Sequence, residues 1–133
     1  MTFDVYAAHR IPRTSIGAHL TRPPLELLQG TLDLLILKAL SWGPAHGYAI
    51  ARWIEQLTRS VLLVGEGSLY PALHRLEDRG WVEAEWRLSE HNRRAKFYRL
   101  TARGRQQLRA ETAIWTGFVK AVQQVLNASE RPA

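Results

Sequence analysis

The sequence predicts a mainly α-helical fold with one small β-hairpin, which is an α+β arrangement. Apolar residues recur at helical spacing in three segments between residues 25 and 80, and they alternate with polar residues between residues 81 and 101. A seven-residue apolar repeat then runs through residues 102–127. The chain has 133 residues, the size of one small domain.

The first two helices are separated by a clear break. Residues 25–41 are so rich in leucine that this helix must be buried on more than one side. Residues 42–44 end it, because glycine accepts a left-handed cap and proline cannot continue a helix. Residues 47–58 form a second, amphipathic helix, and the β-branched run at residues 61–64 predicts a short strand.

A third helix is expected to begin between Gly65 and Ser68 and to end at Gly80. At 100° per residue, one side carries an apolar stripe made of Leu69, Leu73 and Leu76, with Ala72 beside them. The opposite side is expected to carry Pro71, His74, Arg75 and Asp78.

The alternating region predicts two strands joined by a polar loop. Residues 81–88 read as a half-buried strand, and residues 94–101 alternate again. One face of the first strand carries Val82, Ala84, Trp86 and Leu88, and the other face carries Glu83, Glu85 and Arg87. We expect a connecting loop of four or five residues, because no Asn-Gly or Asp-Gly pair marks a tight turn.

Thr101 is the expected N-cap of the last helix. Its apolar stripe is too wide and too long to be buried only in a small core, and it predicts packing against another helix. Dimerisation would also help to stabilise so small a domain. The expected dimer residues are Leu108, Trp115, Phe118, Val119, Val122, Val125 and Leu126. The predicted organisation is a flexible arm at 1–24, a folded domain at 25–101, a dimerisation helix at 102–127 and a tail at 128–133.

Composition narrows the classes of protein. The chain has no cysteine, which removes disulfides, thiolate metal sites and thiol nucleophiles, and which fits a cytoplasmic location. No segment has the ~20 apolar residues that a membrane span needs, and residues 1–15 lack the apolar core of a secretory signal. The net charge is +6, and residues 87–109 hold eight basic residues against one acid, Glu90. Such a concentration predicts a polyanionic partner.

The order of helix, helix, short strand, helix, hairpin and long helix is that of a winged helix-turn-helix. In such a unit the second helix of the pair enters the major groove of double-stranded DNA with its N-terminal residues leading. The expected contacts from this recognition helix are Gly67, Ser68, Tyr70, Pro71, His74 and Arg75. The expected contacts from the hairpin, which is the wing, are Arg93, Arg94 and Lys96.

Four segments also resemble the PadR family of bacterial transcription factors. They read LLQGTLDLLILKAL, GPAHGYAI, GEGSLYPALHRLEDRGWVEAEW and RRAKFYRLTARG, and the similarity covers roughly residues 26–126. The resemblance implies a winged helix-turn-helix, a homodimer held by the C-terminal helices, and repression of nearby genes. The single helix after the wing is similar to the short-tailed subfamily. The sequence departs from the family in its 24-residue N-terminal extension.

The resemblance also implies a small aromatic effector, because some members bind planar aromatic compounds between subunits through a tryptophan of the last helix. Trp115 matches that position. Its place on the apolar stripe favours the dimer core, and effector contact is the alternative. A winged-helix module that docks on a protein without reading DNA is the alternative for the whole chain.

The remaining polar residues favour structural roles. His46 is expected to cap a helix through a backbone contact rather than to act as a ligand or sensor. His74 and His91 have no partner at metal spacing, and Glu83 and Glu85 lie on an exposed strand face. The sequence therefore predicts no enzyme, no cofactor and no metal site.

Overall fold

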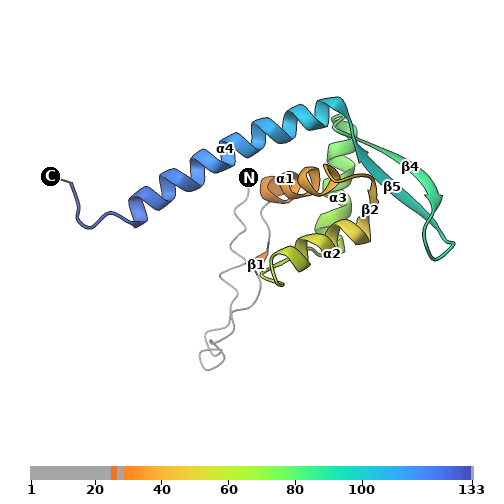
Figure 1. Cartoon of the computed structure of the whole chain (residues 1–133), viewed down its shortest axis with the longest axis horizontal. Helices are drawn as coiled ribbons and strands as arrows, with labels where there is room; N and C mark the ends of the chain where they lie inside the picture. Colours follow the sequence, from red (N-terminus) through yellow and green to blue (C-terminus); the bar gives the residue numbers. More distant parts are fainter. Residues whose placement is uncertain (1–24, 27–28, 133) are drawn as a thin grey trace, which may run out of the picture.

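A computed structural model describes residues 25–26 and 29–132, and Figure 1 shows how their elements are arranged. The expected arm at residues 1–24 lies outside the described residues. The elements are β1 (Leu25–Glu26), α1 (Gln29–Leu40), β2 (Ala45–His46), α2 (Gly47–Leu57), β3 (Leu62–Leu63), α3 (Glu66–Asp78), β4 (Val82–Leu88), β5 (Arg94–Leu100) and α4 (Ala102–Leu126). The expected winged helix-turn-helix order is confirmed.

The start of the first helix was predicted wrongly. Leu25 and Glu26 form β1, which pairs in parallel with Leu62 and Leu63 of β3, and α1 begins only at Gln29. Helical spacing cannot reveal this, because the strand forms only when a segment nearly 40 residues away offers its backbone as a partner.

The hairpin belongs to a three-stranded antiparallel sheet in the order β2-β5-β4. The pairing of Val82 with Leu100 and of Leu88 with Arg94 leaves a five-residue loop, as expected. Strand β2 was not predicted. Its two residues, Ala45 and His46, are too few to show alternation, and they pair with Tyr98 and Phe97 of β5.

The core lies among α1, α2, α3 and the base of the hairpin. Helix α1 is buried on several sides, as its leucine content predicted, and it contacts α2, α3 and α4. The most deeply buried large side chains are Leu32, Ile36, Leu37, Leu40, Ile50, Leu69, Leu73, Leu76 and Val82. Among the described residues, Asp33 of α1 is the one buried charged side chain.

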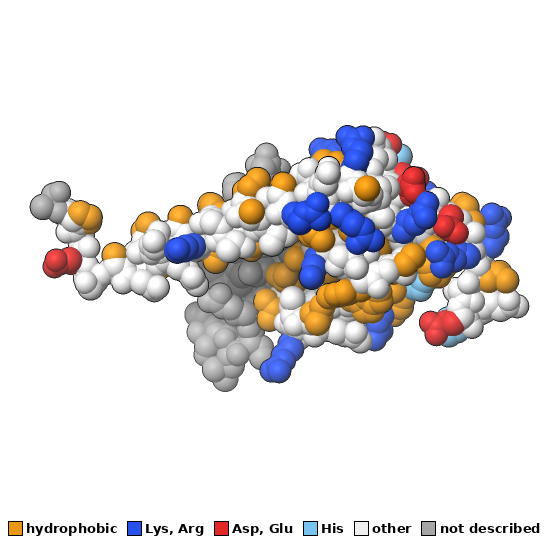
Figure 2. All heavy atoms as spheres, turned by 45° about the horizontal axis from the view of Figure 1, so that its top comes forward, with side chains coloured by type: hydrophobic (Ala, Val, Ile, Leu, Met, Phe, Trp, Pro, Cys, Tyr) orange, Lys and Arg blue, Asp and Glu red, His pale blue; other side chains and the backbone are white. Residues whose placement is uncertain are grey.

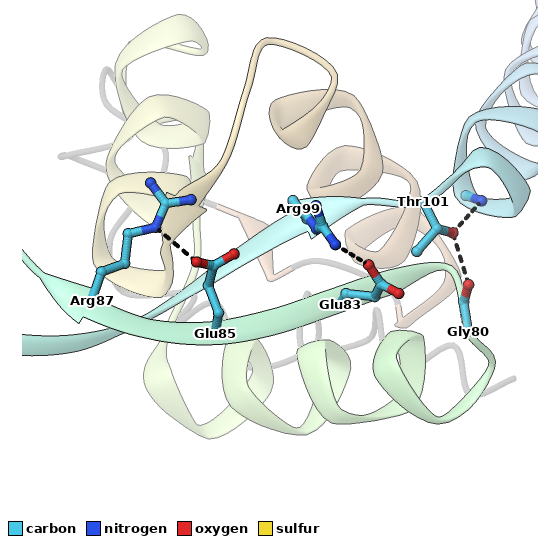
Figure 3. Close-up of polar contacts among 7 residues, drawn as sticks. Gly80, Glu83, Glu85, Arg87, Arg99 and Thr101 are labelled. Carbon is cyan, nitrogen blue, oxygen red and sulfur yellow. Dashed lines mark hydrogen bonds and ion pairs between the residues drawn. The ribbon is translucent and has the colours of Figure 1, made fainter.

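Two expected caps are confirmed. His46 accepts a hydrogen bond at Nδ1 from the backbone N–H of Ala49, 3.2 Å away, at the start of α2. Thr101 accepts one at Oγ1 from the N–H of Gly104 (3.0 Å) and donates one to the carbonyl of Gly80 (2.8 Å), as Figure 3 shows. These bonds hold the first turn of α4 against the loop that ends α3, so α4 leaves the domain in a defined direction.

Helix α4 extends away from the rest of the protein (Figure 1). Its first turns pack on the domain through buried Gly104 and half-buried Leu108. Beyond them the helix exposes large apolar side chains, including Phe118 at 59 % and Leu126 at 75 %. None of the described helices combines the length and the apolar character that crossing a membrane requires.

Candidate nucleic-acid interface

The N-terminal half of α3 presents an exposed surface. Leu69, Ala72, Leu73 and Leu76 are buried, which confirms the predicted core side of the helix. Gly67, Ser68, Tyr70, Pro71 and His74 are exposed. The N-cap is Gly65, whose lack of a side chain leaves the end of the helix uncapped by its own residue. A helix N-terminus with accessible N–H groups favours contact with phosphate.

Arg75 does not lie on that exposed surface, so its expected orientation was wrong. Its Nη2 atom is 2.8 Å from Oδ1 of Asp33 in α1, and the side chain is 27 % exposed. The spacing along α3 gave no sign of this, because a guanidinium group several bonds from the backbone goes to the carboxylate that the neighbouring helix supplies. Asp33 is 42 positions earlier in the chain.

A groove of about 590 Å³ separates the exposed side of α3 from the inner face of the wing. Its walls carry aromatic and basic side chains from α3, the wing and the start of α2. The aromatic ones are His46, Tyr48, Tyr70, Trp86, His91 and Tyr98, and the basic ones are Arg93, Arg94 and Lys96. All three wing cations that the sequence predicted therefore lie beside the same groove as Tyr70.

The inner face of the wing stacks cations on aromatic rings. The guanidinium of Arg94 lies 5.0 Å from the ring centre of Trp86, and Nζ of Lys96 lies 5.6 Å from that of Tyr98. Lys96 also lies 3.5 Å from Oε1 of Glu77, so part of its charge is already compensated. Each such contact contributes about 0.5–1 kcal/mol at an exposed site and so favours one orientation of the cationic side chain.

Trp86 and Leu88 are exposed by 57 % and 62 %, although the alternating pattern predicted a half-buried face. Only the base of β4 meets the core, where Val82 is buried, and the strand then projects beyond it. Sequence reasoning missed Trp86 as part of the groove. A signal was available in the sequence, because the apolar face of this strand extends further than the neighbouring short helices can cover, which leaves its far end exposed.

The outer face of the wing is close to neutral. Arg99 pairs with Glu83 at 2.6 Å, and Arg87 lies 3.6 Å from Glu85 (Figure 3). The basic excess that the sequence showed therefore divides into two places, the tip of the wing and the first half of α4. Figure 2 shows basic side chains gathered over the hairpin and the adjoining start of α4.

The predicted dimer residues form a second feature, on α4. Trp115 and Phe118 lie with ring centres 6.0 Å apart, and both are exposed. Leu108 is half-buried beside α1, where it lines a groove of about 540 Å³ with Leu34 and Leu35. Val119 is half-exposed, whereas Val122, Val125 and Leu126 are exposed.

These elements define a winged helix-turn-helix protein with a long additional C-terminal helix. Residues 36–110 match the family described as the transcriptional regulator PadR-like family, and the chain belongs to that family. It is a transcriptional regulator by family, and the predicted resemblance is confirmed.

Solved structures of transcriptional regulators share this fold with the chain. A PadR family transcription regulator from Clostridium difficile is 30 % identical, with a TM-score of 0.64, covering 72 % of this chain and 98 % of that one. A transcriptional regulator from Clostridium thermocellum is 28 % identical, with a TM-score of 0.66 and coverages of 72 % and 93 %. A 37.1 kDa protein in transposon TN4556 of Streptomyces fradiae is 46 % identical over 79 residues, which cover 59 % of this chain and 21 % of that protein. The match thus spans about a fifth of the transposon protein.

Proposed function

We propose that the chain is a dimeric, sequence-specific DNA-binding repressor of the bacterial cytoplasm. The observation that carries this proposal is the groove in which Tyr70 of α3 lies beside the wing cations Arg93, Arg94 and Lys96. The exposed N-terminal turn of α3 directly precedes Tyr70. An anionic strand that lies in this groove meets the guanidinium groups of the wing, and its continuation along α3 reaches the N–H groups of the helix start.

The parts of this surface have different roles in the proposal. Gly67 and Ser68 let the backbone of α3 come close to the duplex, and Pro71 and His74 lie on the same exposed side for base edges. Tyr70 lies between helix and wing, where its hydroxyl suits a phosphate. Arg93, Arg94 and Lys96 hold the flanking backbone or enter a minor groove; Lys96 contributes least because Glu77 compensates it.

The dimer is proposed from α4, where Trp115, Phe118, Val122, Val125 and Leu126 of the seven-residue repeat are exposed, as is Ile114 beside them. Two copies joined there present two recognition helices, so the operator is pseudo-palindromic, with half-sites ~34–36 Å apart or a multiple of that. Such pairing also adds stability to a domain with a small core.

Selection from a random duplex library, followed by titration against increasing salt, tests DNA binding. The selected duplex should lose affinity with a log–log slope of about −0.9 per phosphate contacted. Arg94→Ala should make that slope shallower by about one contact, whereas the control Arg87→Ala should not, because Arg87 lies on the outer face near Glu85. A protein-docking module, the alternative function, enriches no duplex and shows no steep salt dependence.

The proposal includes a small planar aromatic effector at Trp115. The 42 % exposure of Trp115 next to Phe118 is what favours it, because two adjacent exposed rings can sandwich a flat ligand in the dimer. Candidate aromatic compounds should quench tryptophan fluorescence, and Trp115→Ala should abolish that quenching while the dimer persists. No quenching across a broad aromatic panel, with dimer and DNA binding intact, rejects the effector alone.

A further inference from the structure

Arg75 and Asp33 form an ion pair inside the contact between α3 and α1. Asp33 is the one buried charged residue among the described residues, at 8 % exposure. Its Oδ1 atom lies 2.8 Å from Nη2 of Arg75. Nε of Arg75 is itself buried and has no hydrogen-bond partner within the described residues. The guanidinium of Arg75 therefore stays between α1 and α3, since turning it outward would leave the carboxylate of Asp33 buried and unpaired.

Breaking such a pair from one side is costly, because an uncompensated charge then remains in a poorly solvated place. Burial already raises the pKa of Asp33, and the hydrogen bond and charge of Arg75 oppose that rise. The pair thus resists any rotation or sliding of α3 that would separate the two groups. Leu69, Leu73 and Leu76 bury the same side of α3, but apolar burial is non-directional, whereas the ion pair joins two specific groups.

The position of Arg75 makes this restraint relevant to the exposed half of α3. Arg75 follows Ser68 by seven residues, so both lie on nearly the same side of the helix, two turns apart. That side is covered by α1 at Arg75 and is free at Ser68. Whatever fixes the rotation of α3 at Arg75 therefore also fixes the direction in which Ser68 and its neighbours point.

We propose that Arg75 is a positioning residue for DNA recognition: through Asp33 it sets the rotation and depth of α3, and it does not itself touch the duplex. This inference rests on the proposed DNA binding. It assigns to Arg75 a role different from the base contact that its place in the sequence suggested.

The test compares Arg75→Met, Asp33→Asn and the double variant, with Arg105→Met as a control for loss of an exposed arginine on α4. Each is titrated against the duplex that the wild-type protein selects from a random library, at several salt concentrations. Titrations are done at a temperature where circular dichroism shows the variant fully folded. Both single variants should bind about tenfold or more weakly, which is the discrimination that one base contact provides. The double variant should be no weaker than the weaker single one, and the salt slope should stay that of the wild type.

Three results would overturn the inference. A salt slope shallower by about 0.9 in Arg75→Met would place Arg75 on a phosphate. Weaker binding by Arg75→Met together with unchanged or tighter binding by Asp33→Asn would show that Arg75 acts on DNA without its partner. Wild-type affinity in both folded variants, with only the melting temperature lowered, would make the pair merely structural. Failure of the wild-type protein to select any duplex is a separate result, which would reject the proposed function and with it this inference.

Discussion

Tyr70 of α3 packs its ring against Gly47, the first residue of α2. A Cβ atom added to Gly47 would lie 2.9 Å from both Cε1 and the hydroxyl oxygen of Tyr70, closer than side chains pack. The absence of a side chain at Gly47 therefore sets where the tyrosine ring stands in the groove between α3 and the wing.

Gly47→Ala should move Tyr70 without unfolding the protein. The atoms that must give way are the far end of an exposed side chain. Alanine also favours helix over glycine, by up to about 1 kcal/mol in a helix interior and by less at the first helical position that Gly47 occupies. We expect an unchanged or slightly higher melting temperature and DNA affinity lower by about tenfold, the equivalent of one lost contact. Tyr70→Ala should be as weak alone as in combination with Gly47→Ala. An additive loss would show that Gly47 acts independently of Tyr70.

Gly104→Ala, unlike Gly47→Ala, should lower the stability of the fold. A Cβ there would overlap the carbonyl oxygen of Trp81 and would lie 2.8 Å from Cδ1 of Leu100, and the backbone cannot move away easily. We expect a loss of about 1–3 kcal/mol in the free energy of unfolding, measured with urea. Gly30→Ala in α1 is the matched control, because a Cβ there meets nothing within 4 Å, and it should not destabilise the protein.

Removal of Arg75 should make stability depend on pH in a defined direction. Burial raises the pKa of Asp33 above its ordinary value of 3.8, so the folded state binds a proton more tightly than the unfolded state. The free energy of unfolding then falls as pH rises from the ordinary pKa to the raised one. Arg75→Met removes two of the three effects that lower this pKa, its hydrogen bond and its charge, and leaves only the charge of Arg79. The variant therefore extends that window to higher pH.

The free energy of unfolding of Arg75→Met should consequently lie further below that of the wild type at neutral pH than near pH 4. Urea titrations at both pH values would measure this difference. The double variant Asp33→Asn/Arg75→Met carries no titrating group at this place, so its stability relative to the wild type should not show this additional loss between pH 4 and neutral pH. A deficit that is equal at both pH values would contradict the assignment of the effect to Asp33.

Charged substitutions on α4 should separate the subunits while leaving the domain folded. Phe118 and Val122 are 59 % and 39 % exposed, and neither contributes to the core. Phe118→Glu/Val122→Glu should sediment as a monomer at micromolar concentration with near-native circular dichroism, while the wild-type protein sediments as a dimer. Lys120→Glu lies on the opposite side of the helix and is the matched control. A monomeric wild-type protein would contradict the proposed dimer.

Local pattern was sufficient for much of the fold. The buried leucines of α3, the five-residue wing loop and the caps at His46 and Thr101 all follow from spacing and residue type over a few positions. Trp86 shows where that reasoning stops, because alternation identifies a strand face but not how far the core extends beneath it.

The sequence by itself determined the order of the elements, the apolar faces and the basic wing, since each depends on neighbours within one or two turns of the chain. Only the tertiary structure decided that Arg75 turns inward to Asp33, that β2 joins the wing, and that Glu83 neutralises Arg99. Those outcomes depend on which group a flexible side chain or a short backbone segment meets in space. That group comes from another element, whose position is settled only when the whole core packs.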